Sequence, residues 1–366
     1  MKINFYNFLT NKKKIKKLSY LLADGKYTSP IFSKGSLFIR ANAKLPDHLK
    51  KTKLQNYLSL KNLKVLIRGC VFFINDIIGS LTTSFIVNKN NNSNYEIVIA
   101  SNQSDFVLID SSNNKVMRIL NDNIDFKEYV KKRKEYELYI NSVQFDVESY
   151  EKKQIVEPLV KGQYIKDLNL NDKIKNIRNL LKKFLIYSSE NQQKINDEIL
   201  TLQDNILMLL NQIELIPVIN QKLIDIDFKK KITDYKYISS HTDLSNNNMI
   251  FLNDELLVID FPYMKLFPTF YDPFTMIFLT GNDVYFEFLS GKFNNELYEI
   301  LECSNKKKID RKLRLEEAII EFIVFHAFRK VTQLDDQNIN ACQFKKNIMI
   351  AWEKWYLHYK NKNKIG

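Results

Sequence analysis

A polar loop and the hairpin that follows it hold the residue types that could do chemistry. Asp243 and Asn248 lie five residues apart in the loop, and Asp260 comes directly after an apolar run at 256–259. The turn residues Asn253 and Asp254 predict a hairpin that returns Asp260 to the loop. We therefore expect two carboxylates and one amide oxygen to converge on one spot. Such hard oxygen ligands suit Mg²⁺, and phosphoryl transfer needs one Asp to accept a hydroxyl proton and an Asn and an Asp to hold the metal.

This stretch resembles the catalytic signature of the aminoglycoside phosphotransferase and choline kinase family, a branch of the protein-kinase-like fold. The matching residues are His241, Asp243, Leu244 and Asn248 of HxDLxxxN, followed by Ile259, Asp260 and Phe261. The resemblance implies that Asp243 is the catalytic base and that Asn248 and Asp260 bind the metal. It also implies that Asp272, which opens the next helix, bonds to the loop, and we expect His241 to hydrogen-bond within the loop rather than act as a nucleophile. The competing interpretation is that Asp243 and Asn248 only cap a turn.

Three short strands are predicted earlier in the chain, at 95–100, 106–109 and 115–119, with a tight polar turn at 111–114. Their short connections make them an antiparallel meander, which resembles the first three strands of a kinase N-lobe. The loop that would cover the phosphates of ATP then consists of Ser101, Asn102, Gln103, Ser104 and Asp105. It contains no glycine, so hydroxyl, amide and backbone donors would have to bind the phosphates. An ordinary hairpin turn is the alternative interpretation.

The third strand of the family carries a lysine for the α- and β-phosphates, and the matching position here is Arg118. Strand alternation puts Arg118 and its rival Lys115 on opposite faces. The resemblance implies Glu135 of the following helix as the partner of Arg118, with Glu128 and Glu137 as rivals. Arginine and lysine are not interchangeable, so this departure from the family pattern bears directly on activity.

The strand ending at 155–160 resembles the one that leads into the kinase hinge. Backbone groups around Glu157 and Leu159 would then meet adenine. Pro158 has no N–H, so the donor must come from a neighbour.

Strands dominate before residue 166 and helices after it, which predicts an α+β fold. The resemblance implies a two-lobed protein-kinase-like fold. We expect an N-terminal extension of unassigned role over 1–90, an N-lobe over 91–165, and a helical C-lobe with the catalytic loop over 166–366. A helical insertion at 166–237 would build the acceptor site. Asp272 follows Asp260 within twelve residues, which leaves no room for a long activation loop and favours a small-molecule or glycan acceptor over a protein.

The chain has a formal net charge of +13 and a pI near 9.3. Nucleic acid, an anionic membrane or an anionic glycan could exploit that field, but many of the lysines have A/T-rich codons and codon bias is the competing explanation. No nucleic-acid-binding signature is present, so no nucleic-acid partner is expected. The charge disfavours polycationic aminoglycosides and favours an anionic sugar, such as a lipopolysaccharide or capsule unit. Aromatic residues that could hold a cation are Tyr263, Phe267, Phe270, Trp352, Trp355 and Tyr356, although the last three have the spacing of helix-packing residues.

The compartment is predicted from cysteine usage and hydropathy. Three widely spaced cysteines and four histidines argue against a disulfide scaffold or a zinc site, and they fit a reducing compartment. The most apolar segment, 65–87, is interrupted by Arg68, Asn75 and Asp76, so we expect buried strands or a core helix there rather than a membrane span. With no secretory signal, the expected location is the cytoplasm, with peripheral contact to an anionic membrane allowed by the charge.

The sequence therefore predicts a kinase that uses ATP and Mg²⁺ to phosphorylate a hydroxyl of a small molecule or glycan. A choline, ethanolamine or aminoglycoside-type kinase is one alternative. A pseudokinase that binds nucleotide without turnover is the other, because of Arg118 and the glycine-free loop.

Overall fold

The structure is a computed structural model of the whole chain. It describes residues 18–23, 25–28, 37–40, 85–87, 94–100, 106–121, 124–193, 196–261, 264–304, 311–332 and 340–362. The chain divides into two compact units. The strand unit comprises Met1–Phe126 and Gln144–Val160, and the helical unit comprises Lys127–Val143 and Lys161–Gly366. A unit built on a sheet and a unit built mainly on helices confirm the α+β class predicted from the sequence.

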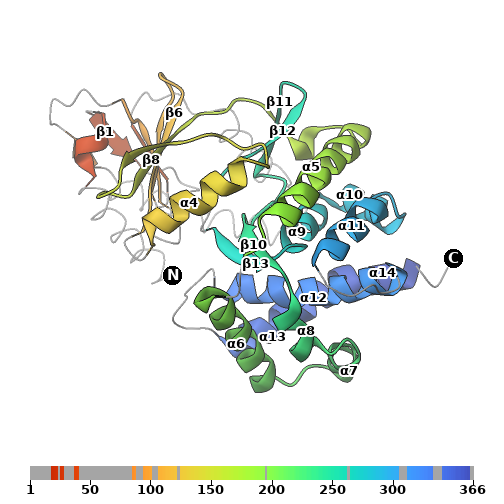
Figure 1. Cartoon of the computed structure of the whole chain (residues 1–366). Helices are drawn as coiled ribbons and strands as arrows, with labels where there is room; N and C mark the ends of the chain where they lie inside the picture. Colours follow the sequence, from red (N-terminus) through yellow and green to blue (C-terminus); the bar gives the residue numbers. More distant parts are fainter. Residues whose placement is uncertain are drawn as a thin grey trace, which may run out of the picture. The chain divides into compact units, whose positions relative to one another are not determined.

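The strand unit contains one antiparallel sheet, visible around the labels β1, β6 and β8 in Figure 1. Its strands are β1 (Gly25–Thr28), β2 (Leu37–Arg40), β3 (Phe85–Val87), β4 (Ile97–Ala100), β5 (Phe106–Asp110), β6 (Lys115–Ile119), β7 (Asp146–Ser149) and β8 (Gln154–Pro158), after a short 3₁₀ turn η1 (Ser19–Leu21). Among the described residues the strand order is β3-β1-β2-β4-β5-β6-β8-β7. The predicted meander is confirmed, because β4 pairs with β5 and β5 with β6.

The two faces of this sheet alternate along each strand. Met117 packs on one face with a cluster that includes Leu22, Tyr27 and Leu108. Val116 packs on the other face with Ile97 and Ile109. Since side chains alternate with a period of two, Arg118 shares the face of Val116.

Part of the first 90 residues belongs to this sheet. Strands β1, β2 and β3 all come from that region, and β2 pairs with β4 of the meander. The buried hydroxyl of Tyr27 lies 2.7 Å from the carbonyl oxygen of Tyr95. These described pieces extend the sheet. Of the apolar segment 65–87, only β3 lies in the described residues.

The helical unit contains two small sheets and most of the helices. Its strands are β9 (Gln163–Tyr164), β10 (Tyr237–Ser240), β11 (Met249–Leu252), β12 (Glu255–Val258) and β13 (Lys265–Pro268). Its helices are α4 (Phe126–Glu137, from Lys127 on), η2 (Ile165–Asp167), α5 (Leu170–Glu190), α6 (Asp197–Gln212), α7 (Pro217–Asp225), α8 (Phe228–Asp234), α9 (Tyr271–Thr280), α10 (Asn282–Leu289), α11 (Asn294–Ser304), α12 (Arg311–Thr332), α13 (Ala341–Ala351), the π turn η3 (Trp352–Tyr356) and α14 (Leu357–Lys362). None of the helices in the described part of the chain has the length and apolar character needed to cross a bilayer.

Local sequence signals account for where several of these helices begin. Asn169 caps α5 by accepting a hydrogen bond from the N–H of Asp172, and Asn196 caps α6 in the same way through Ile199. Pro217 stands in the first turn of α7, where its missing N–H costs nothing.

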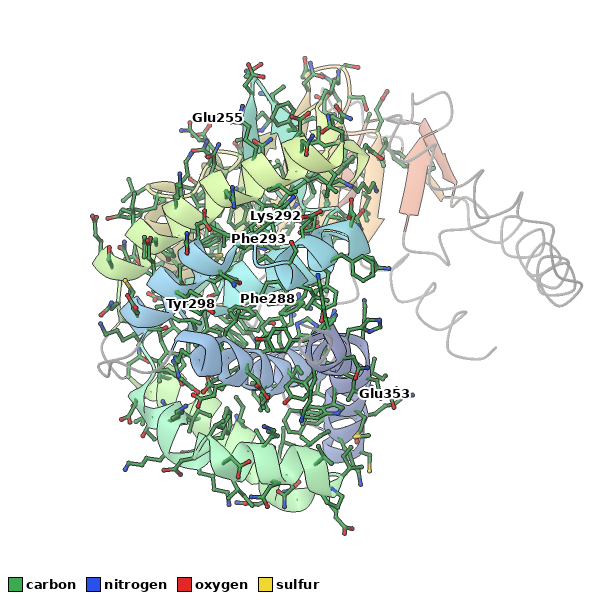
Figure 2. The ribbon with its side chains drawn as sticks, turned by 90° about the vertical axis from the view of Figure 1, so that its right-hand side faces the viewer. Glu255, Phe288, Lys292, Phe293, Tyr298 and Glu353 are labelled. Atoms are coloured by element: carbon green, nitrogen blue, oxygen red, sulfur yellow. The ribbon has the colours of Figure 1, made fainter. Side chains whose placement is uncertain are left out.

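Aromatic side chains fill the core of the helical unit. Figure 1 shows α9, α10 and α11 grouped beside α5, and α5 contacts each of the three. Figure 2 shows Phe288 and Phe293 directed into this unit, whereas Glu255 and Glu353 lie at its surface. Helix α12 contributes further buried rings, among them Phe322.

Two paired strands and a hairpin frame the polar loop at 241–248. Strand β10 pairs antiparallel with β13, and β11 pairs antiparallel with β12 and with β9. The hairpin predicted from the sequence is confirmed, with Asn253 and Asp254 in its turn, both at positive φ. The loop therefore runs from the end of β10 to the start of β11, and Asp260 follows β12.

Candidate active site

His241 is a buried structural residue of the polar loop. The N–H of Asp243 donates to His241 Nδ1 at 3.3 Å, so the other ring nitrogen carries the proton and Nε2 donates to the carbonyl oxygen of Ile259 at 3.0 Å. The ring also packs edge-on against Phe261, at 4.7 Å between centroids. Burial lowers the pKa of His241 to about 3, so the imidazole is neutral at physiological pH. This arrangement joins the loop to the segment that carries Asp260.

Asp272, fully buried at the start of α9, binds the backbone of the same loop. Its carboxylate accepts hydrogen bonds from the N–H groups of His241 at 2.7 Å and Thr242 at 3.0 Å. Thr242 has a φ of +63°, a left-handed conformation that is costly for a β-branched residue. Burial raises the pKa of Asp272 to about 7, although both backbone bonds favour its ionised form. The structure thus places Asp272 in contact with the loop, as the resemblance implied.

Asp243 and Asn248 are directly bonded to each other. The side-chain NH₂ of Asn248 donates to the Asp243 backbone oxygen at 2.8 Å and to its Oδ2 at 3.2 Å. Burial raises the pKa of Asp243, and the charge of Asp260 adds to that effect, while Arg329 and Lys330 oppose it. A simple turn cap would bond a side chain to nearby backbone N–H groups, whereas here the amide fixes a carboxylate.

Asp260 joins this pair through its neighbour in the chain. The N–H of Ile259 donates to the Asn248 carbonyl oxygen at 2.9 Å, and the Ile259 carbonyl accepts from His241. Asp260 itself is exposed and has a φ of +59°, so a non-glycine residue is held in the left-handed region. Hydrogen bonds of the adjacent backbone therefore tie the segment that carries Asp260 to Asn248, and Asn248 is bonded to Asp243; convergence of all three side chains stays a prediction.

The donor set fits Mg²⁺ better than a transition metal. Asn248 uses its NH₂ on Asp243, which leaves the carbonyl oxygen Oδ1 as the side-chain atom for a cation. Asp260 adds one exposed carboxylate. Within the described ranges there is no group of three or more His, Cys, Asp or Glu side chains suited to a metal. One amide and one carboxylate leave most of the octahedral shell to water and phosphate oxygens, which is how proteins commonly hold Mg²⁺.

Helix α4 contacts the segment that carries Asp260. The guanidinium of Arg133, fully buried, lies 4.3 Å from the centre of the Phe261 ring. Arg133 also donates to Glu137 at 3.1 Å and to the Val143 carbonyl at 2.8 Å. Tyr136 of the same helix packs edge-on against Phe261. The sequence analysis missed Arg133, because a helix with many charges offers no local sign of which one is buried.

Two further cations that sequence reasoning missed lie near Asp243, at the end of α12. The side chain of Arg329 is buried, and its Nη2 lies 3.6 Å from Asp243 Oδ1. Lys330 is half-buried, and burial together with the charge of Arg329 lowers its pKa, while Asp243 raises it. Basic residues are common in the last turn of a helix, where they interact favourably with the helix dipole. Their position in the sequence therefore did not identify Arg329 and Lys330 as residues of the site.

The strand unit contains Arg118 in an ion pair. Arg118 Nε lies 3.1 Å from Glu157 Oε2, and both side chains are mostly buried. Val116 pairs with Glu157 across β6 and β8, so Glu157 is the diagonal same-face neighbour of Arg118. Lys115 is exposed, which favours Arg118 over its rival. The partner expected from the sequence, Glu135, belongs to the helical unit, and that pairing stays a prediction.

The remaining nucleotide-binding predictions are placed as follows. The N–H of Leu159 donates to the Asn114 carbonyl oxygen at 2.7 Å. This donor is therefore already used within the sheet, and an adenine ring would need a neighbouring backbone group. Residues Ser101, Asn102, Gln103 and Ser104 lie outside the described residues. Of the rival glutamates, Glu137 binds Arg133 and Glu128 lies 4.0 Å from Lys132.

Comparison with known proteins gives likenesses only at the level of structure. No sequence model of a known protein family and no curated protein matches the chain. A choline kinase from Streptococcus pneumoniae is similar at 12% identity and a TM-score of 0.46, over 70% of this chain and 90% of that one. An ethanolamine kinase from Plasmodium vivax is similar at 15% identity and a TM-score of 0.40, over 85% of this chain and 95% of that one.

An aminoglycoside phosphotransferase solved with ADP and hygromycin B is similar at 10% identity and a TM-score of 0.42, over 68% of this chain and 90% of that one. At such identities these likenesses assign no activity to the chain. The function is therefore inferred from the residues of the site.

Proposed function

We propose that this protein is an ATP-dependent phosphotransferase that moves the γ-phosphoryl group of ATP to a hydroxyl of a small molecule or glycan. The observation that carries the proposal is the linked arrangement of Asp243, Asn248 and Asp260. Asn248 donates to both the backbone and the carboxylate of Asp243, and Ile259 binds Asn248 directly before Asp260. In this proposal the carboxylate of Asp243 takes part in proton transfer, and the amide oxygen of Asn248 and the carboxylate of Asp260 hold the metal.

Asp243 acts as the base in this proposal. It accepts the proton of the acceptor hydroxyl while the hydroxyl oxygen forms a bond to the γ-phosphorus. The bond from that phosphorus to the bridging oxygen of ADP breaks, and ADP leaves with the electron pair. Burial raises the pKa of Asp243, which makes it a stronger base than an exposed aspartate. The amide of Asn248 keeps the carboxylate oriented toward the acceptor.

Asn248 and Asp260 would hold Mg²⁺ through their side-chain oxygens. When bound, Mg²⁺ neutralises negative charge on the phosphates. The backbone of Asp260 is left-handed, and contacts of Ile259 and Phe261 with His241 hold the residues on either side of it.

Arg118 is proposed to bind the α- and β-phosphates in place of the lysine of the resembled family. Its ion pair with Glu157 fixes the rotamer of the guanidinium before the nucleotide arrives. A planar guanidinium can contact a carboxylate and a phosphate oxygen at once. We propose that the loop Ser101–Ser104 covers the phosphates and that backbone groups around Glu157 meet adenine. Because ATP is the donor, we place the reaction in the cytoplasm.

The acceptor is proposed to bind at the helical insertion, and an anionic cell-surface sugar is the favoured class. The five candidate aromatics that lie in the described residues are all buried, at 4% exposure or less: Phe267, Phe270, Trp352, Trp355 and Tyr356. They pack the core and do not line an aromatic site for a quaternary ammonium, which weighs against a choline-type acceptor. We further propose that the acceptor is lipid-linked and that this basic chain contacts an anionic membrane peripherally to reach it.

A nucleotide-binding pseudokinase is the second candidate. Arg118 favours this candidate, because an arginine stands where the resembled family has a lysine and the two are not interchangeable. The guanidinium, which is paired with Glu157, would then bind the nucleotide without supporting transfer of the phosphoryl group.

Transfer from labelled ATP and Mg²⁺ to a library of hydroxyl acceptors tests these candidates. We expect Asp243→Asn to bind ATP as the wild type does and to lose transfer by about a thousandfold or more, because proton acceptance is lost. Asp254→Asn, the same change at an exposed hairpin-turn residue, is the matched control and should transfer normally. ATP binding without transfer to any acceptor would favour the pseudokinase, and absence of ATP binding would reject both candidates.

A further inference from the structure

The end of α12 places two cations beside the proposed base. Arg329 is buried with its Nη2 at 3.6 Å from Asp243 Oδ1, within ion-pair range but too far for a hydrogen bond. Lys330, the next residue, is half-buried and its charge acts on Asp243. Asn248 already orients the Asp243 carboxylate through a hydrogen bond, so the two adjacent cations are not needed for that purpose.

The side-chain ammonium of Lys330 has no hydrogen-bond or ion-pair partner within the part of the chain that the structure describes. Burial and the neighbouring guanidinium both disfavour its charged form. An ammonium that has lost part of its hydration and is repelled by a nearby cation gains strongly from an anion. The ammonium of Lys330 is therefore the group at this point that an anionic ligand would bind.

The other charged groups around this point do not fill that role. His326, one turn earlier on α12, is buried beside Lys330, Arg329 and Lys354, and burial lowers its pKa well below the usual value, so it stays neutral. Asp260 is assigned to the metal, and Asp272 accepts two backbone N–H groups. Asp243 is then the carboxylate that lies within ion-pair range of Arg329 and on whose charge Lys330 acts, and it is bonded to Asn248.

We propose that Arg329 and Lys330 form an anion subsite for the acceptor, so that the substrate carries a phosphate or carboxylate group next to the hydroxyl that is phosphorylated. This rests on the proposed phosphotransferase function and names the acceptor class. Lys330 contacts the anionic group, and Arg329 lies between that group and Asp243. Cationic acceptors are repelled by the pair, whereas the anionic group brings the hydroxyl to the base.

The first experiment compares matched acceptors with the full-length protein, Mg²⁺ and ATP. The pairs are glycerol with glycerol 3-phosphate and glucose with glucuronate, and choline and ethanolamine serve as cationic acceptors. We expect kcat/KM to favour the anionic member by about 10- to 100-fold, the range of one charge-assisted hydrogen bond. Lys330→Met should lower the ratio of anionic to neutral kcat/KM about tenfold, and Lys330→Arg should retain part of it. Lys346→Met, an exposed lysine of α13, is the control and should keep the wild-type ratio.

A preference for choline or ethanolamine over every anionic acceptor would overturn the proposal. So would an equal loss for neutral and anionic acceptors in Lys330→Met, since that result would assign Lys330 to the transferred phosphoryl group.

The second experiment does not depend on turnover. Trace labelling with acetic anhydride, read by mass spectrometry, measures the reactivity of Lys330 relative to Lys346. With Mg²⁺ and a non-hydrolysable ATP analogue bound, we expect inorganic phosphate and glycerol 3-phosphate to protect Lys330, and choline not to protect it. Failure of both anions to protect Lys330 would overturn the anion subsite. Protection without transfer to any acceptor would instead reject the phosphotransferase and leave the anion subsite standing.

Discussion

Replacing Arg133 with methionine tests whether α4 supports the segment that carries Asp260. The guanidinium is fully buried, bonds Glu137 and the Val143 carbonyl, and lies over the Phe261 ring. Methionine keeps much of the volume but removes the charge, so Glu137 is left largely buried without this cation. Breaking a buried ion pair by removing one partner costs about 3–5 kcal/mol, and we expect the free energy of unfolding to fall by that amount.

A second substitution separates the effect of the buried carboxylate from the other contributions to the loss of stability in Arg133→Met. In Arg133→Met/Glu137→Gln the mostly buried negative charge is removed as well, and the loss of stability should shrink to about 2 kcal/mol, the value of the hydrogen bond to Val143 and the contact with Phe261. Lys131→Met, at an exposed position of the same helix, should change stability by no more than about 0.5 kcal/mol.

Urea denaturation followed by circular dichroism measures all three variants. Looser packing of Phe261 should also raise the Mg²⁺ concentration for half-maximal transfer several-fold, because Asp260 is the adjacent residue. A loss below about 1 kcal/mol in Arg133→Met, or a double variant no more stable than the single one, would refute the reasoning.

Further predictions concern the metal, the histidine and the strand cation. Asp260→Ala should leave the fold intact and make ATP affinity independent of Mg²⁺, and calorimetric titration with and without Mg²⁺ that still shows metal dependence would contradict the ligand assignment. The folded-state pKa of His241, about 3, lies below its unfolded value. The contribution of the neutral, buried imidazole to the free energy of unfolding is therefore complete above about pH 6.5 and is lost as the pH falls toward 3. Between pH 8 and pH 5 the stability gap between the wild type and His241→Leu should therefore shrink by about 2 kcal/mol in urea titrations, and a constant gap would show that this imidazole titrates normally. Arg118→Lys should retain much of the activity. Arg118→Ala should raise the KM for ATP, lower kcat and cost about 3 kcal/mol of stability, because it removes one partner of a mostly buried ion pair. Steady-state kinetics that show no change in Arg118→Ala would remove Arg118 from the ATP site.

Local signals in the sequence were sufficient to predict the elements whose strands are adjacent in the chain. The hairpin of β11 and β12 and the meander of β4, β5 and β6 follow from alternating apolar residues separated by short polar turns, and their observed registers agree. The same is true of the polar loop, because Asp243, Asn248 and Asp260 are brought together by that hairpin over only 18 residues.

Contacts over long sequence separations were decided only by the tertiary structure. Arg329 and Lys330 meet Asp243 across more than 80 residues, and Arg133 meets Phe261 across more than 120. Which side of a charged helix is buried depends on the packing of that helix against others, and no local periodicity records it. The ion pair of Arg118 with Glu157 was not predicted for a related reason: Glu157 becomes a neighbour of Arg118 through the register between β6 and β8, which joins residues 39 positions apart. Spacing along the chain therefore determined the residues of the proposed chemistry, and helix and strand packing decided which charges surround them.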